Sequence, residues 1–258
     1  SINGNGSIPL SGSGLNVRVE GTAPLTVVQG QLASRGASID GRARFDITAR
    51  GSLQQPQPSG IVSLQGATLT DPVSNLKLTN INLIAGLDAQ RITIRSGSAN
   101  LSAGGSVNIS GSVGLTGNLP ADLAVQLKNA RYTDGATFDT SASGRLTVTG
   151  ALVADPLLAG TVNLGKTEIT VPENFAGSAD LLEVTNVSPP ARVQRTLARI
   201  ERSRPPRTPN SRPSVLRLDV TVNAPNQIFV RGRGLDAELG GRIRLTGPVT
   251  NVKPVGRF

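Results

Sequence analysis

The chain has 258 residues, a formal net charge of +9 and 2% aromatic residues, and it contains no His, Cys, Met or Trp. Without His and Cys, the usual ligands of zinc, copper, haem and iron–sulfur centres are missing, as are Ser-His-Asp and Cys-His nucleophile pairs. A Ser/Lys or two-carboxylate enzyme is formally open, but the acidic residues are scattered along the chain. We therefore predict no catalytic site, no metal and no cofactor.

The positive charge suits an acidic partner such as nucleic acid or anionic lipid headgroups. Proteins that bind single-stranded nucleic acid stack the bases on aromatic side chains. This chain has one Tyr and five Phe, so we predict no nucleic-acid partner. Its apolar runs are only a few residues long, too short for a membrane-spanning helix. We expect a fragment of a longer chain, with any anchor or export signal outside it.

Apolar and polar residues alternate through most of the chain. The clearest alternating segments are residues 15–20, 43–48, 76–79, 92–95, 107–110, 123–128 and 216–223. Successive side chains of a strand point to opposite faces, so each segment presents one apolar and one polar face. The sequence therefore predicts an all-β, antiparallel sheet of about sixteen strands, each of about five to eight residues, extending over roughly 75 Å.

Glycines between the alternating segments are expected to mark turns. The expected turn glycines are Gly21, Gly36, Gly51, Gly66, Gly86, Gly97, Gly111, Gly117, Gly135, Gly144, Gly150 and Gly160. A faint repeat also relates residues 60–64 (GIVSL) to 160–164 (GTVNL), with Pro56 and Pro156 before them. Such repetition suits an elongated sheet whose units contact only their neighbours.

The apolar face of this sheet is predicted to be an open groove. Compact two-sheet cores usually draw on aromatic rings, because each ring buries a large area. Here the apolar residues are Leu, Ile, Val and Ala with five scattered Phe, which favours an elongated, curled sheet with an apolar interior. An aliphatic sandwich is the structural alternative.

A basic, Pro-rich segment at residues 187–213 interrupts the pattern. It divides the chain into amphipathic strands at 1–186, the insertion, and further strands at 214–258. The insertion is either a solvated segment between two strands or a short amphipathic helix on anionic lipid or an acidic partner. Its arginines Arg195, Arg199 and Arg202 are candidate contacts in the second case.

The strongest family signal lies in the last quarter of the chain. The run FVRGRGLDAELGG at 229–241, preceded by the alternating segment 216–223, closely resembles the C-terminal domain of the TamB family. From the residues alone, its glycines mark a turn or bulge that sets strand register. Arg231 and Arg233 belong either to a local charge network or to a partner or headgroup contact.

The resemblance implies a specific setting. TamB-like proteins belong to the translocation and assembly module of Gram-negative bacteria and resemble AsmA-like, bridge-like lipid transfer proteins. They are periplasmic, are anchored in the inner membrane, and are built from a curled sheet called a β-taco with an apolar groove. They are implicated in phospholipid transport to the outer membrane. They also pair with a TamA-like barrel of the Omp85 class and are implicated in the assembly of autotransporters and other nascent outer-membrane proteins.

Three functions follow from these observations. The first is a lipid conduit whose groove is lined by Phe45, Ile47, Leu76, Leu78, Ile92, Ile94, Leu123, Val125, Leu127, Leu146, Val148, Leu216, Leu218, Val220 and Val222. The second is an assembly factor whose strand edges template incoming barrel strands. The third is a passive surface β-solenoid, which would show a tighter repeat than this one.

Overall fold

The computed structural model describes residues 1–9, 13–30, 36–115, 117–172 and 215–258. Within these ranges the chain forms fourteen strands and one short 3-10 helix, η1 (Leu25–Val28). The strands are β1 (Ile2–Ser7), β2 (Ser13–Pro24), β3 (Ser38–Asp40), β4 (Arg42–Ser52), β5 (Pro56–Asp71), β6 (Leu76–Leu87), β7 (Arg91–Leu101), β8 (Ser106–Gly114), β9 (Pro120–Thr133), β10 (Phe138–Ala151), β11 (Leu157–Thr170), β12 (Arg217–Gly232), β13 (Leu235–Pro248) and β14 (Lys253–Arg257). No helix in these ranges is long and apolar enough to cross a membrane.

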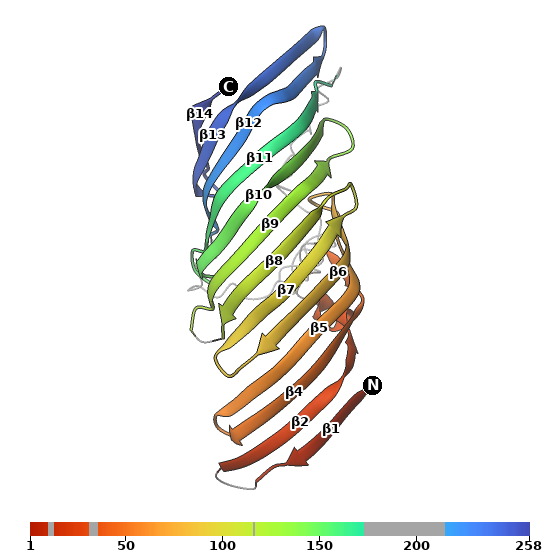
Figure 1. Ribbon diagram of the computed structural model, residues 1–258, viewed down its shortest axis with the longest axis vertical. Helices are drawn as coiled ribbons and strands as arrows, with labels where there is room; N and C mark the ends of the chain where they lie inside the picture. Colours follow the sequence, from red (N-terminus) through yellow and green to blue (C-terminus); the bar gives the residue numbers. More distant parts are fainter. Residues whose placement is uncertain (10–12, 31–35, 116, 173–214) are drawn as a thin grey trace, which may run out of the picture.

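The strands form a single sheet in which nearly every strand pairs with its neighbours in sequence. Figure 1 shows them tilted and stacked along the long axis, from β1 at one end to β14 at the other. The short strand β3 pairs with residues 68–70 of β5, whereas β4 pairs with residues 56–64 of the same strand. The fold is the elongated, open and curled β-sheet that the alternation predicts.

One pair departs from the predicted antiparallel order. β11 and β12 are parallel, with Leu158 opposite Leu218 and Val162 opposite Val222. Parallel neighbours need a long connection, because the chain must return to the end at which it started. Here residues 171–216 make that return, and they include the basic segment that interrupts the alternation.

The strands are fewer and longer than predicted. Both β5 and β12 contain 16 residues, about twice the expected length. The reason is that several glycines expected in turns lie inside strands instead. The glycines of this kind are Gly21, Gly51, Gly66, Gly86, Gly97, Gly111, Gly144, Gly150 and Gly160. Gly66, for example, lies at a register shift within β5.

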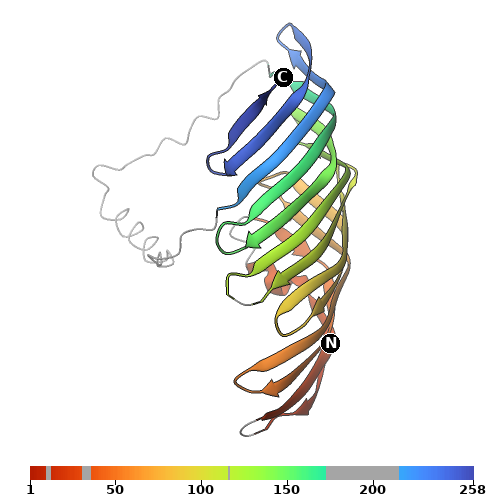
Figure 2. The same ribbon diagram turned by 60° about the vertical axis from the view of Figure 1, so that its left-hand side comes forward.

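Two of these glycines show how the sheet is able to curl. Gly111 in β8 has φ +124°, and a Cβ built on it would lie 2.1 Å from the Asp122 carbonyl oxygen on β9. Gly160 in β11 has φ +139°, and its Cβ would lie 2.2 Å from the Arg145 carbonyl oxygen. Only glycine accommodates this combination, and glycine kinks of this kind introduce curvature into sheets. Figure 2 shows the resulting curve from the side.

The helical turn after β2 packs on the inside of this curve. Leu25 of η1 and Ala67 of β5 are both buried, and both lie against Gly41. A Cβ atom added to Gly41 would lie 3.4 Å from Leu25 Cδ1 and 2.8 Å from the Cβ of Ala67, which is 0% exposed. The side of the sheet that carries Ala67 and Leu25 is therefore its hollow side, behind the strands in Figure 1.

Candidate functional site

Strand register separates the side chains of the sheet into two faces. Directly opposed residues of neighbouring strands share a face. Phe45 of β4 thus shares its face with Gly21 of β2 and Val62 of β5. Val125 of β9 shares the same face with Ile109 and Leu146. Followed from strand to strand, this face is the one that carries Ala67, and we call it the inner face.

All fifteen residues that the sequence singles out as groove lining lie on the inner face. Fourteen are paired residues of β4, β6, β7, β9, β10 and β12, and Leu216 directly precedes β12 in phase with Leu218. Fourteen of the fifteen are half-buried, and Val220 is buried with an exposed fraction of 7%. The sheet therefore brings these side chains together as one surface.

This surface is recessed but not sealed. On the opposite, outer face, Ile61 and Ile84 are each 45% exposed, whereas the fifteen lining residues are all half-buried or buried. The exposed large apolar residues of the inner face include Ile2, Leu235 and Leu239, which lie in β1 and β13 near the two ends of the sheet. In the part of the chain that the structure describes, the largest fully buried side chain is that of Thr167. It is hydrogen-bonded to Thr140 across 2.7 Å. Large aliphatic side chains thus line a hollow rather than fill a closed core.

The inner face is almost free of charge. Among the paired strand residues of the described ranges, Asp71 at the end of β5 is its only ionised side chain. The outer face carries the ion pairs instead: Arg18 with Asp46 at 2.7 Å, Arg131 with Asp139 at 2.5 Å, and Arg244 with Asp219 at 2.7 Å. These pairs are exposed, and each contributes little to stability.

The inner face also contains residues that the sequence analysis did not select. They include Val17, Val19, Val62, Leu83, Ile109, Val162, Ile243 and Leu245. The signal for several was present, since Ile109 lies in an alternating segment. For others a register shift obscured the pattern, as in β6, where Asn80 has φ +50° and two residues intervene before the alternation resumes.

The structure describes two of the five arginines that were predicted as possible partner or headgroup contacts. Arg195, Arg199 and Arg202 lie outside the described residues. Arg231 stacks on Phe229 at 4.8 Å on the outer face, and its Nε donates to Asp236 at 3.1 Å. Arg233 has φ +52° in the β12–β13 turn, where its Nε donates to the Pro172 carbonyl at 2.9 Å. Both side chains therefore hold this turn in place.

Hydrogen-bonded carboxylates on the outer face and in the β9–β10 turn are expected to make folding sensitive to acid. Hydrogen bonds from Arg18 hold the pKa of Asp46 below its usual value, and those from Arg244 do the same for Asp219. The hydroxyl of Thr137, followed by three backbone amides, lowers the pKa of Asp134 in the β9–β10 turn. A lowered folded-state pKa contributes stability above the unfolded value, near 4, and loses it as the pH falls through the folded value.

We therefore expect the thermal unfolding midpoint to fall steadily as the pH is lowered from 5 to 2. The variant Asp134→Asn should lose less on acidification than the wild type, because one of the responsible carboxylates is gone. The side chain of Asp122 makes no hydrogen bond or ion pair within the described ranges, so Asp122→Asn is the matched control and should keep the wild-type profile. Circular dichroism melts across this pH range measure the effect, and a flat wild-type profile would contradict it.

The comparisons with known proteins address the family. The model of the TamB C-terminal domain matches residues 95–258. No curated protein and no solved structure matches the chain. The matched region runs from within β7 to the end of the chain, and it includes the parallel β11–β12 pair and the Gly-rich β12–β13 turn. The chain belongs to the TamB family, whose members act in the bacterial envelope in outer-membrane assembly or lipid transport.

Proposed function

We propose that the inner face is a conduit for phospholipids, in which acyl chains lie against the aliphatic side chains and headgroups stay at the groove margin. The observation that carries this proposal is the continuity of the inner face. From β1 to β14 it passes across every hydrogen-bonded strand of the described sheet, with Asp71 as its only ionised group. Thirteen strands spaced about 4.8 Å apart give the inner face a length of roughly 60 Å.

Aliphatic contact supplies both the affinity and the lack of selectivity that a conduit needs. Each methylene kept away from water is worth about 0.8 kcal/mol. Because Leu, Ile and Val side chains recur along the whole path, an acyl chain exchanges one set of contacts for an equivalent set as it moves. The fifteen lining residues named above would therefore act through nonpolar contact alone.

The cellular setting of the proposal comes from the family. In it, the chain is a periplasmic segment of a longer protein whose anchor lies in the inner membrane. A TamA-like Omp85 barrel would be its partner at the outer membrane. In this arrangement, phospholipids travel along the inner face from one membrane to the other.

The proposal is tested by purifying the chain from a Gram-negative host and recording native mass spectra, followed by lipid extraction. We expect phospholipids to co-purify and a photoactivatable phospholipid to label inner-face peptides of β9 and β12. The aliphatic surface is recessed and uncharged, which is why the label should concentrate there. A lipid-free chain that also resists labelling would contradict the proposal.

A second candidate, an assembly factor for outer-membrane β-barrel or autotransporter proteins, rests on the outermost strands. In the described sheet, β1 and β14 each pair on one side only, and all their residues are exposed. Such edges can add a strand from another chain. However, β14 carries Lys253, Pro254 and Arg257, and charges and proline are features that discourage edge pairing. Photo-crosslinkers on β14 should capture polypeptide if this function holds, whereas those at Val125 should not.

A further inference from the structure

Carboxylates that oppose each other across strands of the outer face are accompanied by cations. Glu20 of β2 lies opposite Asp46 of β4, and the Arg18 guanidinium lies 3.5 Å from the first carboxylate and 2.7 Å from the second. Like charges placed directly opposite are destabilising, and the shared arginine offsets that repulsion. A second opposed pair of carboxylates, between β10 and β11, has its own basic partners.

One opposed pair of the outer face has the opposite sign and no acidic partner. Arg242 of β13 lies directly opposite Arg257 of β14, and it is the only opposed basic pair among the paired strand residues of the described ranges. Both side chains are exposed, and neither makes a hydrogen bond or ion pair with a described residue. Directly opposed Cβ atoms lie about 4.5–5.5 Å apart, so both guanidinium groups can reach one anion.

The three acidic residues of β12 and β13 have other partners. Asp219 accepts from Arg244 at 2.7 and 2.9 Å. Asp236 accepts from Arg231 at 3.1 Å. The third, Glu238, accepts from a backbone amide of β12 at 3.2 Å. The carboxylates of the two neighbouring strands therefore leave the opposed arginines uncompensated.

The opposed arginines belong to a wider basic surface, which we define as the outer-face side chains of residues 217–223, 242–248 and 253–257. Its only acidic residue is Asp219. Val255, which is 67% exposed, adds an apolar side chain opposite Arg244. The exposed cations of this surface are Arg217, Arg242, Arg244, Lys253 and Arg257.

We propose that this basic surface docks on an anionic phospholipid bilayer, with a lipid phosphate between Arg242 and Arg257. Clustered basic residues are attracted to anionic headgroups, and the attraction grows with their number. The planar guanidinium group binds phosphate through two parallel hydrogen bonds. Protein interfaces rely on aromatic anchors, and this surface has none, which favours a bilayer over an acidic protein. The inference goes beyond the proposed conduit, because it concerns the outer face.

The test measures sedimentation of the whole 258-residue chain with phosphatidylcholine vesicles that contain phosphatidylglycerol, at low salt. We expect Arg242→Gln/Arg257→Gln to weaken binding about twenty-five-fold, because each basic residue near an anionic bilayer contributes roughly fivefold. The matched control is Arg44→Gln/Arg50→Gln, which removes two exposed outer-face arginines of β4 that have no side-chain partner in the described ranges. This control should bind like the wild type, and circular dichroism checks that both variants are folded.

The other arms identify the partner. Vesicles of phosphatidylcholine alone should not bind, and high salt should weaken binding to the anionic vesicles, since it screens exposed charges. If Arg242→Gln/Arg257→Gln binds like the wild type, the proposal is wrong. It is also wrong if the chain binds polyglutamate but not the anionic vesicles, because the partner is then an acidic polypeptide. Phospholipid extracted from the same purified samples reports on the conduit separately, so either proposal can fail without the other.

A variant of opposite charge tests the repulsion itself. Arg257→Glu converts the opposed arginines into an opposed ion pair, so amides of β13 should exchange with solvent more slowly than in the wild type. Vesicle binding should fall in the same variant, a combination that misfolding does not produce. Faster exchange of the β13 amides in Arg257→Glu would show that the two arginines do not repel each other, and the proposal would lose its basis.

Discussion

Replacing Gly111 with valine should destabilise the centre of the sheet by roughly 3 kcal/mol or more, because strain and overlap act at the same position. Its φ of +124° is one that a β-branched residue avoids, and the new Cβ would meet the Asp122 carbonyl oxygen and the Leu123 Cα at 2.1 and 2.8 Å. Both obstacles are backbone atoms of β9, so they cannot rotate away. The strand has to straighten or separate, and either change opens the curve.

Local hydrogen exchange is the measurement suited to this variant, because an elongated sheet need not unfold in a single step. Amides of β8 and β9 should exchange faster in Gly111→Val, while those of β1 and β2 should not change. Gly86→Ala is the matched control: a Cβ there would meet only the Arg95 side chain, at 3.5 Å. Exchange in Gly111→Val equal to that of the wild type would show that the glycine does not maintain the curve.

The sequence could predict the strands and their faces because the side-chain period of a strand is two. A segment such as 123–128 carries its own face assignment, and the register places Leu123, Val125 and Leu127 together without any information from distant residues. That these residues contact lipid stays a prediction. The resemblance in FVRGRGLDAELGG agrees with the match to the TamB C-terminal domain.

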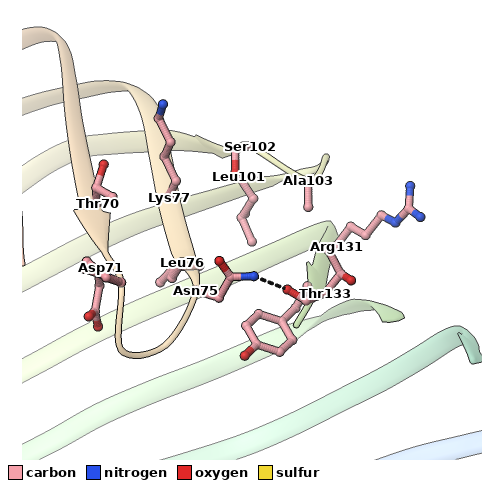
Figure 3. A pocket seen from close by; sticks show the side chains of 12 residues that line it. Thr70, Asp71, Asn75, Leu76, Lys77, Leu101, Ser102, Ala103, Arg131 and Thr133 are labelled. Atoms are coloured by element: carbon pink, nitrogen blue, oxygen red, sulfur yellow. Dashed lines mark hydrogen bonds between the residues drawn. The ribbon is translucent and has the colours of Figure 1, made fainter. Parts of the chain in front are cut away.

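What could not be predicted depends on contacts between strands. Glycine serves both turns and strand kinks, and only the neighbouring strand distinguishes them: Gly60 and Gly160, related by the faint repeat, are both paired inner-face positions with positive φ. The parallel β11–β12 pair leaves no mark in either strand, because alternation is the same in both directions. The hydrogen bond from Asn75 in the β5–β6 turn to the Thr133 carbonyl at the end of β9 (Figure 3) depends on the lengths of the strands, which alternation does not record.

Two carboxylates placed on the inner face should abolish lipid binding. In the double variant Val125→Asp/Leu218→Asp, each new charge lies among aliphatic side chains, since Val125 is flanked by Ile109 and Leu146 and Leu218 by Leu158. An acyl chain at either position would have to desolvate the carboxylate, which costs several kcal/mol. We therefore expect co-purifying phospholipid to fall at least about tenfold.

The control that gives this result its meaning is Ala124→Asp/Thr221→Asp, which adds the same two charges to the same two strands. Ala124 and Thr221 lie on the outer face, opposite Ser110 and Thr161. Net charge and strand context are thus matched, and only the face differs. Normal lipid content in this control together with loss in Val125→Asp/Leu218→Asp would assign lipid to the inner face. If both variants are folded by circular dichroism and contain equal amounts of lipid, the lipid is held elsewhere. This conclusion follows because the face on which the substituted positions lie is the property that distinguishes them most strongly.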